Sequence, residues 1–178
     1  MFHKIVVALD NSQLSQQIFE RAVFLAKATD ARLMLLHVLS LFDEYYLKTG
    51  FPGAESGYPI LYTQTSSRYM KQWEEMEKEG LEWLKSLVQQ ALAAGVNAEF
   101  SQNIGDPGRT ICNIAISWQA DLIIVGRRGR TGLSELFLGS VSNYVLHHAA
   151  CAVLVVQHSE NLNDIPQPQA MDHLNCEL

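Results

Sequence analysis

Short apolar segments rich in β-branched residues alternate along the chain with segments whose apolar residues recur every three or four positions. The first pattern is typical of strands covered on both faces, and the second of amphipathic helices. The predicted strands span residues 4–9, about 32–39, about 97–102, 122–125 and 152–156. The predicted helices run from about Ser12 to Thr29, from about Ser66 to Ala94, onward from Pro107, and from Gly139 to about His148. This α/β alternation predicts a single open five-stranded parallel sheet, doubly wound, with helices on both faces.

The carboxyl ends of the predicted strands form the edge at which a ligand is expected. In doubly wound sheets, ligands bind outside these ends, at the point where the strand order reverses. The ends of the first, second and fourth strands lie at Asp10, Val38 and Gly126. These three positions are therefore candidates before any motif is considered.

Two segments fall outside the alternating pattern. The segment 41–65 is 25 residues long, which exceeds an ordinary connection, and its six aromatic residues are too many for a solvated linker. Since it leaves the carboxyl end of the second strand, it could be a lid over a ligand, a surface for a protein partner, or an insertion with no fixed position. After Gln157 the sequence becomes polar, which predicts a flexible tail over 158–178 following a domain at 1–157.

Composition and charge exclude several classes of protein. The 178 residues fit one domain, and the net charge of −6 argues against a partner that is nucleic acid or an anionic membrane. The apolar runs are too short to span a bilayer, and the N-terminus lacks the layout of a signal peptide. Three widely spaced cysteines predict neither disulfides nor a zinc site. These features predict a cytoplasmic protein.

The stretch 126–143 has the chemistry of an anion site. Its first glycine leaves a strand, and Gly129 permits a close or left-handed backbone, so that amide groups can face a ligand. Gly139 and Ser140 open the following helix, whose unpaired N–H groups attract phosphate. The hydroxyls of Ser140 and Ser142 can add donors. A glycine-punctuated turn with Ser140 as an ordinary N-cap explains the same glycines, so both interpretations stand at this point.

The spacing within this stretch resembles a known signature. The motif is a glycine, two residues, a second glycine, nine residues, and then a glycine–serine pair. This spacing resembles the nucleotide-binding motif of the universal stress protein family, in its ATP-binding branch. Further matches to the family lie at residues 8–12, 36–38, 105–107, 120–126 and 152–156. The resemblance covers about residues 2–157. It implies an adenine-nucleotide α-hydrolase-like fold with the strand order 3-2-1-4-5.

The resemblance also implies a ligand and a set of binding residues. The ligand would be ATP or a related adenine nucleotide, accompanied by Mg²⁺ or Mn²⁺. The residues assigned to it are Ala8, Leu9, Asp10, Val38, Gly126, Arg128, Gly129, Gly139, Ser140, Val141 and Ser142. Asp10 would meet the ribose or a phosphate-bound cation, and the backbone of Val38 would pair with the base. One departure is Arg128, where the family often has histidine; an arginine there could pair with phosphate or face solvent.

Other sites of chemistry are not indicated. The chain lacks both the P-loop pattern and the dinucleotide fingerprint of three glycines after the first strand. His37 ends a buried strand and Cys151 precedes one, so both are interpreted as core residues. With no evident group to activate water, we expect a sensor or regulator. The alternatives are a dimeric interaction module in which the nucleotide is only structural, or a slow ATP hydrolase.

The last predicted strand, Ala152–Val156, favours a homodimer. In the expected order it lies at an edge of the sheet, where its unpaired backbone groups are blunted by neither proline nor charge. Pairing with the same strand of a second copy would close the assembly by two-fold symmetry. The family resemblance implies the same contact. Alternatively, the tail 158–178 covers this edge.

Overall fold

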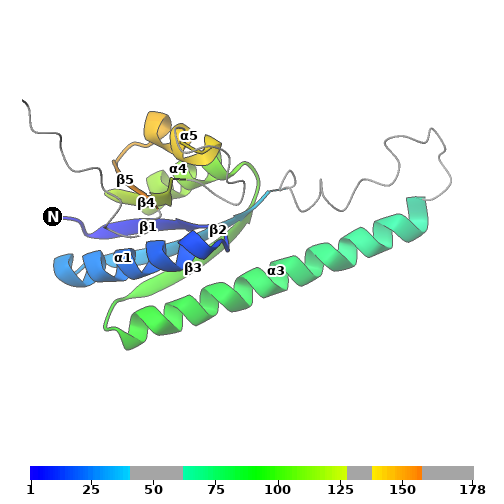
Figure 1. Ribbon diagram of the computed structural model, residues 1–178, viewed down its shortest axis with the longest axis horizontal. Helices are drawn as coiled ribbons and strands as arrows, with labels where there is room; N and C mark the ends of the chain where they lie inside the picture. Colours follow the sequence, from blue (N-terminus) through cyan, green and yellow to red (C-terminus); the bar gives the residue numbers. More distant parts are fainter. Residues whose placement is uncertain (41–61, 128–137, 158–178) are drawn as a thin grey trace, which may run out of the picture.

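A five-stranded parallel sheet forms the centre of the computed structural model, which describes residues 1–40, 62–127 and 138–157. Its strands are β1 (Lys4–Leu9), β2 (Arg32–Leu39), β3 (Ala98–Ile104), β4 (Leu122–Gly126) and β5 (Ala152–Val156). The described helices are α1 (Gln13–Thr29), α3 (Tyr62–Ala93), α4 (Pro107–Trp118) and α5 (Ser140–His148). The sheet order is β3-β2-β1-β4-β5 (Figure 1), which confirms the predicted fold.

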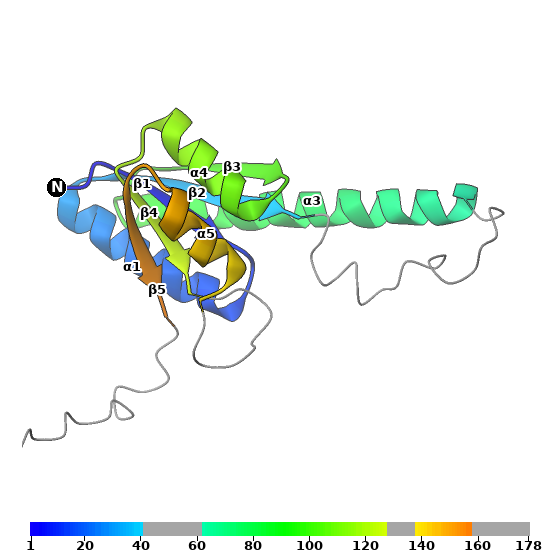
Figure 2. The same cartoon turned by 90° about the horizontal axis from the view of Figure 1, so that it is seen from above.

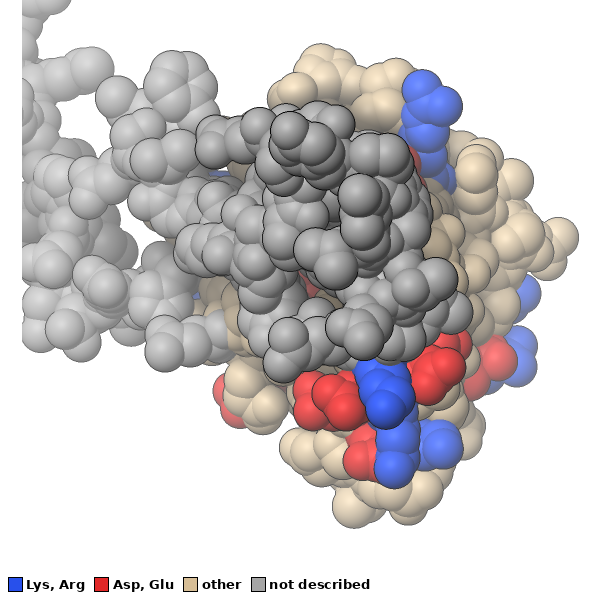
Figure 3. All heavy atoms as spheres, turned by 90° about the vertical axis from the view of Figure 1, so that its right-hand side faces the viewer, with Lys and Arg blue, Asp and Glu red and all other residues tan. Residues whose placement is uncertain are grey.

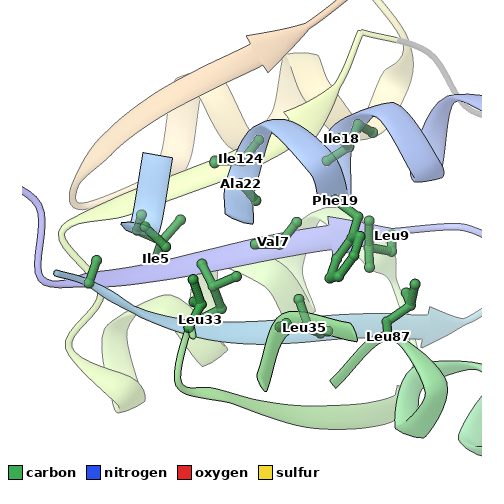
Figure 4. Packing of buried hydrophobic residues seen from close by; sticks show 14 of the residues in the cluster. Ile5, Val7, Leu9, Ile18, Phe19, Ala22, Leu33, Leu35, Leu87 and Ile124 are labelled. Carbon is green, nitrogen blue, oxygen red and sulfur yellow. The ribbon is translucent and has the colours of Figure 1, made fainter. Parts of the chain in front are cut away.

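Helices cover both faces of the sheet, with α1 and α3 on one side and α4 and α5 on the other (Figures 1 and 2). Side chains alternate between the two faces along each strand. In β1, Ile5 and Val7 enter the core beneath α1 and α3 (Figure 4), whereas Val6 enters the core beneath α4 and α5. All three are fully buried, which explains why the strand is apolar at nearly every position.

Two element boundaries differ from the sequence prediction by more than one residue. Helix α3 begins at Tyr62, four residues before the predicted start, so the last part of the predicted insertion 41–65 is helical. An earlier start is possible because no proline or glycine lies between Pro59 and Ser66. Strand β3 runs on to Ile104, past the predicted end at residue 102. The rest of the insertion and the predicted tail lie outside the described residues.

The 32-residue helix α3 is about 48 Å long at 1.5 Å per residue, and it reaches well beyond the sheet (Figure 1). Among the residues of α3 whose burial the structure describes, the buried ones lie in the C-terminal half: Gly80, Leu84, Leu87 and Ala91. On the face seen in Figure 3, basic and acidic side chains lie side by side, as expected for a solvated surface. Within the described residues, no helix combines the length and apolar character needed to cross a bilayer.

Candidate functional site

A gap opens between β1 and β4 at the carboxyl edge of the sheet. The pairing of these strands ends at Val7 and Ile124. Both strands continue for two more residues, β1 alongside β2 and β4 alongside β5. Among the described residues, Ala8 and Leu9 on one side and residues 125–126 on the other therefore have no partner strand across the gap. This is the point of strand-order reversal at which doubly wound sheets bind ligands.

At three of the predicted site residues, Ala8, Leu9 and Val38, the backbone is the main part of the residue that can face this gap. The side chains of Ala8 and Leu9 lie in the two opposite hydrophobic cores and are at most 9% exposed. Beyond His37, β2 is paired with β3 alone among the described strands. The edge of Val38 that faces β1 is therefore open to another hydrogen-bonding group, as the predicted backbone contact with a base requires.

Asp10 is held in place at the end of β1 by the first turn of α1. Its Oδ1 accepts hydrogen bonds from the Ser12 backbone N–H at 3.1 Å and from the Ser15 hydroxyl at 2.9 Å. The Ser15 hydroxyl in turn accepts from the backbone N–H of Asp10 at 3.1 Å. Asn11 between them adopts a left-handed backbone with φ of 58°. The carboxylate thus has a fixed position beside the gap, where it can meet a cation bound to phosphate.

Sequence reasoning missed Ser15, which is only 1% exposed and makes two of these hydrogen bonds. Serine three residues after an N-cap position is a signal for this arrangement, because its hydroxyl can reach back to the residues before the helix. The N-cap residue itself, Ser12, makes no capping bond through its side chain. Asp10 instead accepts a hydrogen bond from the N–H of Ser12, which fixes the chain just before the helix.

The N-terminus of α5 presents, at the same edge, backbone donors that have no acceptor in the part of the chain that the structure describes. Its first helical hydrogen bond is donated by Asn143 to the carbonyl of Gly139 at 2.9 Å. Among the described residues, no carbonyl accepts from the N–H groups of Ser140, Val141 or Ser142. The first turn of α5 contains no acidic residue. Three N–H groups and the positive end of the helix dipole therefore remain for an anion.

Hydrogen bonds join this helix end to the end of β4. The Gly139 N–H donates to the carbonyl of Arg127 at 2.8 Å, and the Arg127 N–H donates to the carbonyl of Val156 at 2.7 Å. The Ser142 hydroxyl lies 2.9 Å from the Arg127 carbonyl oxygen and 3.0 Å from that of Gly139. The N-terminal end of α5 is thus hydrogen-bonded directly to Arg127, the residue that follows Gly126. Arg128 and Gly129 lie outside the described residues.

Three titratable side chains, those of His37, Cys112 and Cys151, are buried or partly buried. His37 is 6% exposed, and its ring meets that of Trp83 edge-on, with 5.6 Å between the centroids. Burial raises the pKa of the Cys112 thiol. Burial also raises the pKa of Cys151, with smaller contributions from Asp121 and Cys112. A raised pKa disfavours the reactive thiolate, so neither cysteine has the properties of a nucleophile.

Comparison with known proteins identifies the family of this chain. The model of the universal stress protein family matches residues 1–157. The chain belongs to the universal stress protein family. Among its relatives, the universal stress protein Sll1388 of Synechocystis is 41% identical over 157 residues, covering 88% of this chain and 99% of the relative.

Solved structures of this family share the fold. A universal stress protein in complex with cAMP has a TM-score of 0.56 and 24% identity, over 88% of this chain and 97% of its own. An Arabidopsis thaliana member of the family with AMP bound has a TM-score of 0.56 and 21% identity, over 93% of this chain and 97% of its own. Adenine nucleotides are thus ligands of at least two proteins with this fold.

Proposed function

We propose that this chain binds an adenine nucleotide, ATP or a close relative, in the gap between β1 and β4. The observation that carries the proposal is the N-terminus of α5. Its first three N–H groups have no backbone acceptor among the described residues, its first turn holds no acid, and Gly139 before it is hydrogen-bonded to Arg127, the residue that follows β4. The binding of cAMP and AMP by two structural relatives supports this ligand class.

The proposed site divides the nucleotide among the strand ends and α5. The open backbone edge of Val38 receives the base, and the backbone of Ala8 and Leu9 lines the base and ribose. Gly126 and the N-terminus of α5 hold the phosphates. The remaining proposed contacts are Arg128, Gly129, Gly139, Ser140, Val141 and Ser142. Asp10 meets Mg²⁺ or Mn²⁺ carried by the phosphates, because a carboxylate beside phosphate is favourable only with a cation between them.

We propose a sensor or regulator as the role of this binding. The described residues whose side chains lie at the gap are suited to holding a ligand. His37, which could act as a general base, packs its ring against that of Trp83. General-base catalysis needs a group within hydrogen-bonding reach of the proton that it removes. In this proposal, the bound state of the nucleotide is the signal, and any hydrolysis is slow.

A second candidate, a dimeric interaction module, is favoured by β5. This strand ends the sheet, and Leu154 on it is 41% exposed. Its sequence, Ala-Val-Leu-Val-Val, has none of the charges or prolines that usually protect an edge. We propose that β5 pairs with β5 of a second copy, which is compatible with nucleotide binding on the other side of β4, in the gap that faces β1.

Gly139→Val tests the nucleotide site. The backbone of Gly139 is extended, with φ of −63° and ψ of 158°, a conformation that valine adopts readily, so the fold should persist. The valine side chain would stand where phosphate approaches the helix end. Titration calorimetry with AMP, cAMP and ATP–Mg²⁺ should show binding by the wild type and at least about tenfold weaker binding by the variant.

Ser140→Ala is the matched control, since it keeps the backbone donors and removes one exposed hydroxyl. It should weaken binding by about fivefold at most, which corresponds to one neutral hydrogen bond. Unchanged affinity in a folded Gly139→Val protein, or a wild type that binds none of the three nucleotides, would refute the proposed site. Phosphate release faster than about 1 s⁻¹ would make the protein an enzyme.

A further inference from the structure

The Ser142 hydroxyl occupies an unusual place at the proposed phosphate site. Ser142 is 1% exposed, and its oxygen lies 2.9 Å from the carbonyl of Arg127 and 3.0 Å from that of Gly139. A hydroxyl has one proton to donate, and both of these neighbours are acceptors. That proton is therefore engaged by the backbone on either side of residues 128–138 and is not presented to a ligand.

We propose that Ser142 is a positioning residue that ties the first turn of α5 to the end of β4. This inference rests on the proposed function, since it concerns the donors that would hold phosphate. In this role Ser142 does not touch the nucleotide through its hydroxyl. It sets where the N–H groups of the helix end lie relative to the gap between β1 and β4.

Two hydrogen bonds from different points of α5 converge on one carbonyl. The Arg127 oxygen accepts from the Gly139 N–H at 2.8 Å and faces the Ser142 hydroxyl at 2.9 Å. A single bond at Gly139 would leave the helix free to tilt about that contact, whereas a second bond three residues further along resists the tilt. Arg127 is itself anchored, because its N–H donates to the carbonyl of Val156 at 2.7 Å. The helix end, β4 and β5 are thereby held as one unit.

Ser117 in α4 provides an internal comparison. Its hydroxyl donates to the carbonyl three residues before it, Ile114, at 3.1 Å, as Ser142 does towards Gly139. Ser117 is exposed, and among the described residues its hydroxyl makes no hydrogen bond beyond its own helix. Ser142 differs from Ser117 because its hydroxyl also lies within hydrogen-bonding distance of the Arg127 carbonyl, 15 residues away in the chain. Ser117→Ala is therefore a matched control for the loss of a local serine bond.

The test combines binding with amide exchange in the full-length protein. The probe is whichever of AMP, cAMP and ATP–Mg²⁺ binds the wild type most tightly. Ser142→Ala should weaken that binding by about fivefold to tenfold and should raise the exchange rate of the Gly139 amide severalfold in the ligand-free protein. Ser142→Cys, which is similar in shape but a weak donor, should behave like Ser142→Ala. Ser142→Thr, which keeps a hydroxyl, should restore both properties, and Ser117→Ala should change neither.

Three results would contradict this inference, each for a different reason. If affinity falls while exchange at Gly139 in the ligand-free protein is unchanged, Ser142 contacts the ligand directly and the positioning role is wrong. If exchange rises while affinity is unchanged, the tie is structural only, and the inference is again refuted. If the wild type binds none of the three probes, the proposed function fails and this inference falls with it.

Discussion

Gly108→Ala tests how closely α4 and α5 approach each other. Gly108 is buried in the first turn of α4, where an added Cβ would lie 2.8 Å from Cγ and Cδ1 of Tyr144 and 2.9 Å from its Cβ. Ordinary van der Waals contact begins at 3.4 Å, so the two helices would have to separate by about 0.6 Å. Rotation of the tyrosine ring cannot relieve this clash, because the Cβ of Tyr144 is itself too close.

The expected cost follows from two opposing effects. Alanine in a helix is favoured over glycine by up to about 1 kcal/mol. Overpacking of this kind typically costs about 1–3 kcal/mol, and the upper half of that range applies where a helix backbone must move. We therefore expect Gly108→Ala to lower the free energy of unfolding by about 1–2 kcal/mol. Since α5 also carries Ser140, its displacement should weaken nucleotide binding as well.

Urea unfolding of Gly108→Ala and Gly80→Ala provides the measurement. At Gly80, the nearest atom to an added Cβ is Oε1 of Gln102, the end of a flexible side chain, with Nδ1 of His37 at 3.0 Å. Gln102 can turn away at the cost of its hydrogen bond to the Glu77 carbonyl, so Gly80→Ala should change stability by less than about 0.5 kcal/mol. The reasoning is wrong if Gly108→Ala is as stable as the wild type, or if both variants lose the same stability.

Three further predictions concern other parts of the molecule. Asp10→Asn should weaken binding of ATP–Mg²⁺ more than binding of ATP with excess chelator, and an equal loss in both would make Asp10 a ribose contact. Val155→Lys should convert a β5-paired dimer to monomers in sedimentation, whereas a variant that stays dimeric would place the interface elsewhere. In a Cys176→Ser background, the raised pKa of Cys112 and Cys151 should make their reaction with a thiol reagent at pH 8 slower than that of free cysteine. Reaction at the rate of free cysteine would contradict the burial of Cys112 and the partial burial of Cys151.

The sequence determined the architecture because the signals for it are local. Strands covered on both faces must be apolar at nearly every position, and this marked β1 and β2. The half-exposed edge strand β5 was marked by its short run of β-branched residues. Asp106 followed by Pro107 predicted the start of α4, and the Asp106 carboxylate does accept from the Arg109 N–H at 2.8 Å. Topological rules for right-handed crossovers then left few sheet orders to choose from.

The sequence also indicated where a ligand site should lie, but the resemblance to a family named most of its residues. Strand ends gave Asp10, Val38 and Gly126, because a parallel sheet gathers its carboxyl ends at one edge. The glycine spacing of 126–143 gave the rest through its likeness to the family motif. Nothing in that pattern distinguished a hydroxyl that faces a ligand from one that faces a carbonyl.

Only the tertiary structure decided those contacts, because they join residues far apart in the chain. The Ser142 hydroxyl meets the Arg127 carbonyl across 15 residues. Gly108 and Tyr144 touch because two helices pack on the same face of the sheet, and β1 separates from β4 beyond Val7 because each follows its other neighbour. Periodicity reports which side of an element is buried, but not which atom of another element lies against it, since that depends on packing summed over the whole core.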